Sequence, residues 1–171
     1  IEHKRKEQSA PKLYDLTTLQ REANRYYGFT ASQTLKIVQE LYEEKLVTYP
    51  QTDSQYITED MQQTMADLLN HYSGEVGKVE QVVNNKKVTD HHAILPTLES
   101  CKRELNSLSG DKEKIFALIV WKMQQAVQPP YIYEDVLVTV CCQDRKFTAK
   151  YKNVLQAGHT AMPVPFAEQE K

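Results

Sequence analysis

One tyrosine stands in a setting that suits a nucleophile. It is Tyr49, within the run VTYPQTDS at positions 47–54. Proline fixes its own φ and keeps the residue before it out of the helical region, so we expect Tyr49 to be extended at the end of a short strand. The hydroxyls and the carboxylate that follow are residue types that order a turn. A phenol presented at a fixed angle in this way can attack an electrophile.

The spacing around Tyr49 also allows an ordinary structural role. The chain contains ten tyrosines, and most tyrosines in proteins are packing residues whose hydroxyl finds a hydrogen-bond partner. From the residues alone, packing is the default and catalysis is the alternative.

A second segment with chemical potential is DHHAILPT at positions 90–97. One imidazole of the pair His91 and His92 could contact a phosphate or transfer a proton, because the pKa of a free histidine is about 6.5. Zinc is not favoured, because no cysteine or further histidine stands at a ligand spacing. Histidines on the surface, or held by hydrogen bonds, are the default. We expect the apolar residues 93–95 to fix this loop by packing.

Composition sets broad bounds on the function. The 171 residues suffice for one core or for a domain with an appendage. The net charge of −2 gives no basic field for nucleic acid, which counts against a DNA-binding protein that acts alone but not against one part of a larger protein. The three cysteines lack a metal-ligand spacing and indicate free thiols in a reducing cytosol. We find no signal peptide, transit sequence or membrane-crossing run, so we expect a cytoplasmic protein.

Capping patterns and apolar periodicity predict four helices, at 17–27, 30–45, 58–73 and 111–127. Thr17 with Gln20 and Thr30 with Gln33 form the capping boxes of the first two, and Gly28 ends the first. Two helices followed by a short strand are typical of a helix-turn-helix or winged-helix arrangement. A plain helical hairpin has the same pattern, and the spacing does not separate the two.

The ends of the chain have a different character from its middle. Alternating apolar residues at 133–142 and 146–151 predict a β-hairpin. Residues 1–10 have no helix start and are predicted to end an element that begins upstream, and the tail from 157 resembles an interrupted connection. We therefore expect a mainly α fold with flanking β, in three parts: 1–12 ends a sheet-domain segment, 13–130 is a helical domain bearing the tyrosine, and 131–171 holds strands that return to the sheet domain.

These motifs, in this order, resemble the type IA DNA topoisomerases. The run YPQTDS resembles the active-site segment of that family, and HHAILPT at 91–97 matches its second motif. The segment PKLYDLTTLQREAN at 11–24 is similar to the entry into the tyrosine-bearing domain of bacterial topoisomerase III. Shorter matches continue at 28–31, 34–35 and 41–43. The resemblance implies a helical, winged-helix-like gate domain inserted into a partial β-sheet domain, the arch that opens to pass DNA.

The resemblance also implies a reaction. Tyr49 would attack a phosphodiester of single-stranded DNA, release a 3′-hydroxyl and hold the 5′-phosphate covalently, so religation needs no nucleotide cofactor. Strand passage would then relax or decatenate DNA. His91 matches the family histidine that contacts DNA near the cleavage site and is the second catalytic candidate. The DNA-binding candidates are Gln51, Thr52, Asp53, Ser54 and His92, of which Asp53 and Ser54 are expected mainly to shape the loop.

Two departures from the family pattern are informative. The family has arginine where this chain has Gln51, and losing a charge-assisted bond to phosphate costs roughly 1.5–3 kcal/mol. Our hypothesis is that the enzyme is weakened at this position or that another cation takes the place of the family arginine. The family's acidic Mg²⁺-binding cluster is also missing from the sequence. We therefore expect Mg²⁺ to be bound by a domain outside these 171 residues, and we expect no metal site within them. Without that domain, the 171 residues are expected to be inert.

Two other classes of function remain open. A non-catalytic winged-helix module would bind duplex DNA through one helix without using Tyr49 or His91. A helical protein-interaction insert would make no DNA contact. The near-neutral charge together with Tyr49 and the histidine pair favours the enzyme, whose partners would be single-stranded DNA and the remaining domains of the same chain, at the nucleoid, with no membrane.

Overall fold

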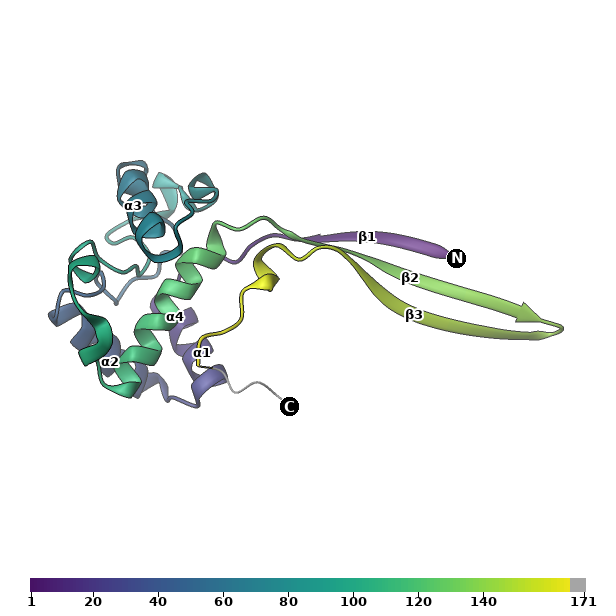
Figure 1. Cartoon of the computed structure of the whole chain (residues 1–171), viewed down its shortest axis with the longest axis horizontal. Coiled ribbons are helices and arrows are strands. Elements are labelled where there is room, and N and C mark those ends of the chain that lie inside the picture. Colours follow the sequence, from purple (N-terminus) through teal and green to yellow (C-terminus); the bar gives the residue numbers. More distant parts are fainter. Residues whose placement is uncertain (167–171) are drawn as a thin grey trace.

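The protein consists of a helical body and a long sheet arm that projects from one end of it (Figure 1). The computed structural model describes residues 1–166. The body contains α1 (Leu16–Tyr27), α2 (Ala31–Glu43), α3 (Gln62–Ser73) and α4 (Gly110–Ala126), joined by loops with short 3₁₀ turns. The arm contains β1 (Glu2–Gln8), β2 (Tyr131–Cys142) and β3 (Arg145–Gln156). The four predicted helices and the predicted hairpin are confirmed.

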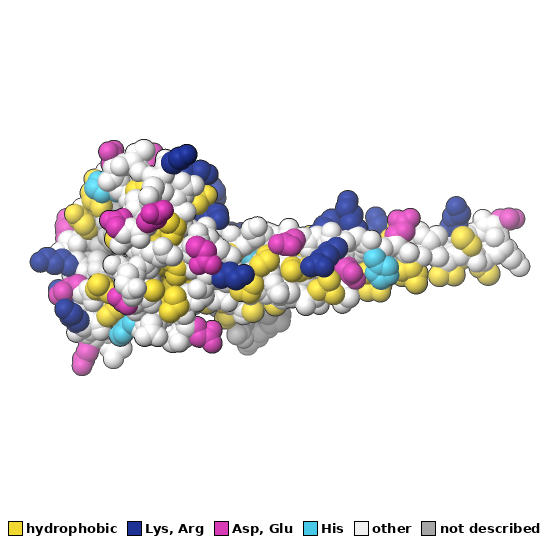
Figure 2. Space-filling view, turned by 90° about the horizontal axis from the view of Figure 1, so that it is seen from above, with side chains coloured by type: hydrophobic (Ala, Val, Ile, Leu, Met, Phe, Trp, Pro, Cys, Tyr) yellow, Lys and Arg dark blue, Asp and Glu magenta, His cyan; other side chains and the backbone are white. Residues whose placement is uncertain are grey.

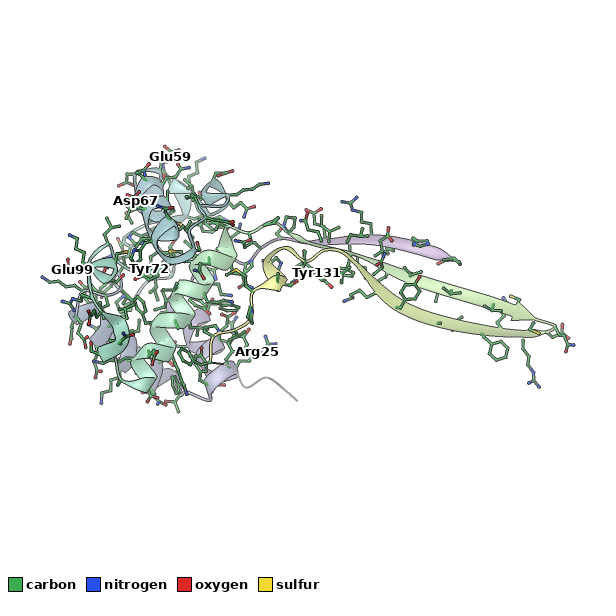
Figure 3. All side chains as sticks on the ribbon, in the orientation of Figure 1. Arg25, Glu59, Asp67, Tyr72, Glu99 and Tyr131 are labelled. Carbon is green, nitrogen blue, oxygen red and sulfur yellow. The ribbon has the colours of Figure 1, made fainter. Side chains whose placement is uncertain are left out.

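The arm is a three-stranded antiparallel sheet in the order β1-β2-β3. Gln8 pairs with Tyr131 at the base of the arm, and Glu2 pairs with Leu137 further out. Figure 3 labels Tyr131, at the junction of the two parts. The segment before the body and the segment after it therefore lie side by side in one sheet. The fold is mixed α and β, and the strand β3 extends beyond the predicted 146–151.

The helix starts follow local capping with one correction. The N-cap of α1 is Asp15, whose carboxylate accepts a hydrogen bond from the backbone N–H of Thr18 at 2.8 Å. The predicted cap at Thr17 is wrong, because an aspartate two residues earlier already satisfies this helix end. The cap at Thr30 is confirmed by its bond from the Gln33 N–H. The third helix begins late, since residues 59–61 form a 3₁₀ turn and Thr58 makes no cap bond.

Two hydrophobic clusters fill the body, and α4 supplies residues to both. The first lies among α1, α2 and α4, and the second among α3, α4 and the loops. The two motif segments also enter the clusters: Leu46, Val47 and Ile94 belong to the first, and Ile57, Ala93 and Leu95 to the second. Burial of these flanking residues anchors the motif segments. No helix among residues 1–166 has the length and apolar character needed to cross a membrane.

Candidate active site around Tyr49

The two motif segments lie side by side in space. The Thr48 N–H donates to the Leu95 carbonyl at 2.9 Å, and the Leu95 N–H donates back to the Thr48 hydroxyl at 3.0 Å. Val47 and Pro96 form an isolated antiparallel bridge. The predicted strand before Tyr49 is thus reduced to this bridge, because the Leu95 N–H bonds to the Thr48 hydroxyl where a strand ladder would use a backbone carbonyl. The pairing fixes the histidine loop beside the tyrosine loop.

Tyr49 is half-buried and lies between two other rings. Its ring centroid is 4.3 Å from that of His91, with the planes tilted by 37°. On another side, Tyr42 of α2 meets it edge-on at 5.5 Å. His91 itself is exposed. The structure therefore brings the two catalytic candidates into contact and adds Tyr42, which was not among the predicted site residues. Aromatic contacts of this kind restrict the tilt of the Tyr49 phenol.

Thr52 and Ser54 are buried, and their hydroxyls are engaged with the protein itself. Thr52 Oγ1 donates to the His91 carbonyl at 3.0 Å and accepts from the Ser54 N–H at 3.2 Å. Ser54 Oγ donates to the Lys87 carbonyl at 2.7 Å and accepts from the Tyr56 N–H at 3.2 Å. These bonds shape the loop after Tyr49. DNA contact by Thr52 or Ser54 stays a prediction.

Gln51 and Asp53 are exposed and open onto a shallow polar hollow. The hollow has a volume of about 420 Å³ and is bounded by the start of α1 and by both motif segments; its lining residues are Leu16, Thr17, Gln51, Thr52, Asp53, Thr89, Asp90 and His91. The Leu16 N–H donates to the Thr52 carbonyl at 3.1 Å, which attaches the helix to the loop. The second histidine does not line this hollow. His92 is half-buried, with Nδ1 2.7 Å from the Ala93 carbonyl.

A buried polar cluster of Tyr14, Glu22 and Lys122 lies behind the histidine loop. The Tyr14 carbonyl accepts the Ile94 N–H, whereas its hydroxyl donates to Glu22. The other Glu22 oxygen pairs with Lys122 Nζ at 3.1 Å. Burial, with Glu22 adding to it, raises the pKa of Tyr14 far above its usual range. Burial also lowers the pKa of Lys122, against the pull of Glu22. Tyr14 is therefore inaccessible and stays protonated, which makes it unsuitable as a nucleophile.

The acidic residues near the hollow do not fit a metal site. Within residues 1–166 no group of three or more histidine, cysteine, aspartate or glutamate side chains is arranged to hold an ion. Asp53 and Asp90 line the hollow as only two carboxylates, and Mg²⁺ binding by another domain stays a prediction.

Comparison with known proteins assigns this chain to a family. The family model for DNA topoisomerase matches residues 1–171. The chain belongs to the DNA topoisomerase family. This topoisomerase chain is 38% identical over 179 residues to DNA topoisomerase 3 of Bacillus licheniformis, covering 96% of this chain and 24% of that protein. It is 39% identical over 171 residues to DNA topoisomerase 3 of Bacillus subtilis, covering 92% and 23%. The resemblance to bacterial topoisomerase III is confirmed.

A solved structure agrees with the assignment. Full-length topoisomerase I from Thermotoga maritima matches with a TM-score of 0.69 and 25% identity, over 99% of this chain and 31% of that one. The topoisomerase chain spans about a quarter of the length of the curated relatives it matches. The fold described above is thus shared with a type I topoisomerase.

Proposed function

We propose that this chain is the tyrosine-bearing part of a type IA DNA topoisomerase and that Tyr49 is its nucleophile. The observation that supports this most directly is the contact of the tilted Tyr49 and His91 rings, with centroids 4.3 Å apart, beside an open polar hollow. We further propose that residues 13–130 act as a winged-helix-like gate domain and that 1–12 and 131–171 belong to the arch. The proposed partners are single-stranded DNA, at the bacterial nucleoid, and the other domains of the enzyme.

The proposed reaction is a transesterification that conserves the phosphate ester. Tyr49 Oη loses its proton and attacks phosphorus, the bond from phosphorus to the 3′ oxygen breaks, and that oxygen takes up a proton to leave as a 3′-hydroxyl. The 5′-phosphate remains on Tyr49 until the 3′-hydroxyl attacks in the reverse direction. One ester replaces another, so no nucleotide is consumed. Passage of a second strand before resealing relaxes or decatenates the DNA.

The side chains of this topoisomerase chain supply position and hydrogen bonds. His91, in ring contact with Tyr49, is placed to meet the scissile phosphate or to receive the phenol proton. Gln51 opens onto the same hollow and offers an amide N–H to a phosphate oxygen. Mg²⁺, bound by a domain outside these residues, supplies electrostatic stabilisation when present. The 171 residues alone are expected to be inactive.

The nucleophile is tested by trapping the covalent intermediate. The full-length topoisomerase is mixed with a labelled single-stranded oligonucleotide and Mg²⁺ and then denatured. We expect a protein–DNA adduct that is lost in Tyr49→Phe and retained in Tyr151→Phe, an exposed tyrosine of the arm. An adduct that persists in Tyr49→Phe rules out this nucleophile. If the protein prefers duplex DNA and Tyr49→Phe leaves this binding unchanged, the non-catalytic winged-helix module is favoured instead.

The adjacent histidines provide a matched pair of variants. His91 touches the Tyr49 ring, whereas His92 lies against its own loop. We expect His91→Ala to slow cleavage by about 10²-fold or more, as the loss of a general acid–base group does. His92→Ala should have a clearly smaller effect. Equal rates for the two variants would remove His91 from the mechanism.

The glutamine at position 51 is tested by adding charge. Gln51→Arg introduces a charge-assisted bond to phosphate, which should raise the cleavage rate by roughly one to two decades. The same adduct assay, followed over time, measures the change. An unchanged rate contradicts the idea that Gln51 limits cleavage.

A further inference from the structure

A second polar hollow adjoins the first on the same face of the body. It has a volume of about 330 Å³ and lies between α1 and the segment after Tyr49; its lining residues are Asp15, Thr17, Thr18, Arg21, Asp53, Ser54, Gln55, Tyr56 and Lys87. Thr17 and Asp53 line both hollows. The two hollows therefore adjoin at these two residues, and together they extend from Gln51 and His91 to Arg21 and Lys87. We call the two together the α1 trough.

The far half of the α1 trough carries two cations. Arg21 and Lys87 are both exposed, and neither forms an ion pair with any residue among 1–166. Of the two carboxylates in this half, Asp15 is already occupied as the N-cap of α1. Two exposed cations free of carboxylate partners are available for an anionic ligand.

Both cations stand on segments that the structure ties to the tyrosine loop. The Lys87 carbonyl accepts the Ser54 hydroxyl, and Lys87 Nζ lies 5.0 Å from the centre of the Tyr56 ring. On α1, the Thr18 hydroxyl accepts from Gln55 Nε2 at 3.1 Å, one helical turn before Arg21. A cation–π contact holds an ammonium group in place and leaves its N–H donors free for a ligand. The segments that carry Arg21 and Lys87 are thus attached to the tyrosine loop, and the Lys87 ammonium is also held over the Tyr56 ring.

The chemistry of the α1 trough fits a sugar–phosphate backbone. Its lining is polar, with hydroxyls, one free carboxylate and two cations, and the ring of Tyr56 is already covered on its face by Lys87 and Lys12. Phosphates are met by guanidinium and ammonium groups, whereas sequence is read by contacts to base edges. A strand whose scissile phosphate lies at Tyr49 can continue along α1 and bring a neighbouring phosphate to these two cations.

We propose that the α1 trough is a phosphate subsite for the single strand being cut, in which Arg21 and Lys87 supply the positive charge that Gln51 lacks. The proposal rests on the proposed function, because it takes Tyr49 as the attachment point. It names the substitute cations and predicts contact with the backbone without preference for sequence. Binding to such a site depends on salt through counterion release.

The first experiment measures binding of a fluorescent single-stranded oligonucleotide by the full-length protein over a range of NaCl concentrations. Each lost phosphate contact lowers the slope of log K against log salt by about 0.7, so Arg21→Ala/Lys87→Ala should lower it by about 1.4. Lys102→Ala/Arg103→Ala, an exposed pair outside both hollows, is the matched control and should keep the wild-type slope. Arg21→Lys/Lys87→Arg keeps both charges and should do the same.

The second experiment asks whether these charges replace the family arginine. Adduct yield should fall in Arg21→Ala/Lys87→Ala, and Gln51→Arg should raise it by a larger factor in that background than in the wild type. A wild-type salt slope in the double alanine variant, or an equal gain from Gln51→Arg in both backgrounds, overturns the proposal. Failure of the proposed function is seen separately, as an adduct that survives Tyr49→Phe.

Discussion

The helical body and the sheet arm hold their shapes by different means. The body buries its apolar residues in two clusters that share α4. In the arm, every residue of β3 is exposed, and Phe147 and Tyr151 are 59% and 56% accessible. Paired residues such as Val140 and Phe147 share one sheet face, and Figure 2 shows hydrophobic side chains along one edge of the arm.

The difference explains where the site can be built. Side-chain packing in the body determines the positions of Tyr49, His91 and the α1 trough. The arm depends on backbone pairing and cross-strand contacts, each of which contributes less than about 1 kcal/mol. A site that needs fixed geometry therefore lies in the body, whereas the arm tolerates change within its own residues.

A buried histidine joins the two regions. His159 Nε2 lies 3.2 Å from the Gln8 carbonyl of β1, and the His159 N–H donates to the Pro129 carbonyl at 3.0 Å. Gln125 of α4 donates to the His159 carbonyl at 3.3 Å. His159 thus ties β1 and the segment just before β2 to α4, the central helix of the body.

The largest expected contrast comes from two phenylalanines. Phe116 is 4% exposed in the first cluster, whereas Phe147 is 59% exposed on β3. We expect Phe116→Ala to lower the free energy of unfolding by about 3–5 kcal/mol, and Phe147→Ala by less than about 0.5 kcal/mol. Urea unfolding of both variants measures the difference. Similar losses would show that the arm is packed in the same way as the body.

Two ion pairs give the next contrast. Glu22→Ala leaves the Lys122 ammonium buried without its carboxylate, at a cost of about 3 kcal/mol at pH 7. Burial lowers the folded-state pKa of Lys122, so the unfolded state binds the proton more tightly and the loss should shrink as the pH rises toward 10.

The control is the exposed pair Lys6–Asp135 of the arm. Asp135→Ala should give no measurable change, because exposed pairs are screened by solvent. Urea midpoints at pH 7 and at about pH 9.5, compared with wild type at each pH, provide the measurement. A pH-independent loss in Glu22→Ala would show that Lys122 is not responsible.

Two glycines, one at the junction and one in the body, allow the two regions to be compared. Both have positive φ, +53° at Gly158 and +72° at Gly74, but a Cβ at Gly158 would clash with the carbonyl oxygens of Pro129 and Pro130, whereas one at Gly74 meets nothing within 4 Å. We expect Gly74→Ala to cost about 1 kcal/mol from its backbone conformation alone. Gly158→Ala should cost at least about 2 kcal/mol. Amide hydrogen exchange should locate its effect at 125–131 and in β1, and equal exchange in both variants would argue against a tight junction.

The smallest effect concerns alkaline pH. Burial raises the pKa of Tyr72 to about 12, although its bond with Ser100 lowers it. An unfolded tyrosine ionises near pH 10, so this stabilising contribution is complete below about pH 10 and is lost as the pH rises toward 12. Tyr72→Phe should therefore lose stability less steeply than wild type between pH 9 and about 11. Parallel pH profiles of the urea midpoint for the two proteins would show that Tyr72 does not cause the loss of stability at alkaline pH.

Local patterns were enough to predict the elements and the chemical candidates. The four helices, the hairpin and the cap at Thr30 depend on spacing within a few residues, and so do the motifs that contain Tyr49 and His91. The cap at Thr17 failed for a local reason as well, because a competing aspartate stands two residues earlier. The strand expected before Tyr49 shrank to one bridge because the Leu95 N–H donates to the Thr48 hydroxyl and not to a backbone carbonyl.

The chain's amino-acid order therefore sets which groups can react, and the folded arrangement sets which of them meet. Pairing of β1 with β2, the ring contact of Tyr49 with His91, and the joining of Arg21 and Lys87 in the α1 trough all connect residues far apart in the chain. No local pattern encodes such meetings, because they follow from how the clusters around α4 pack.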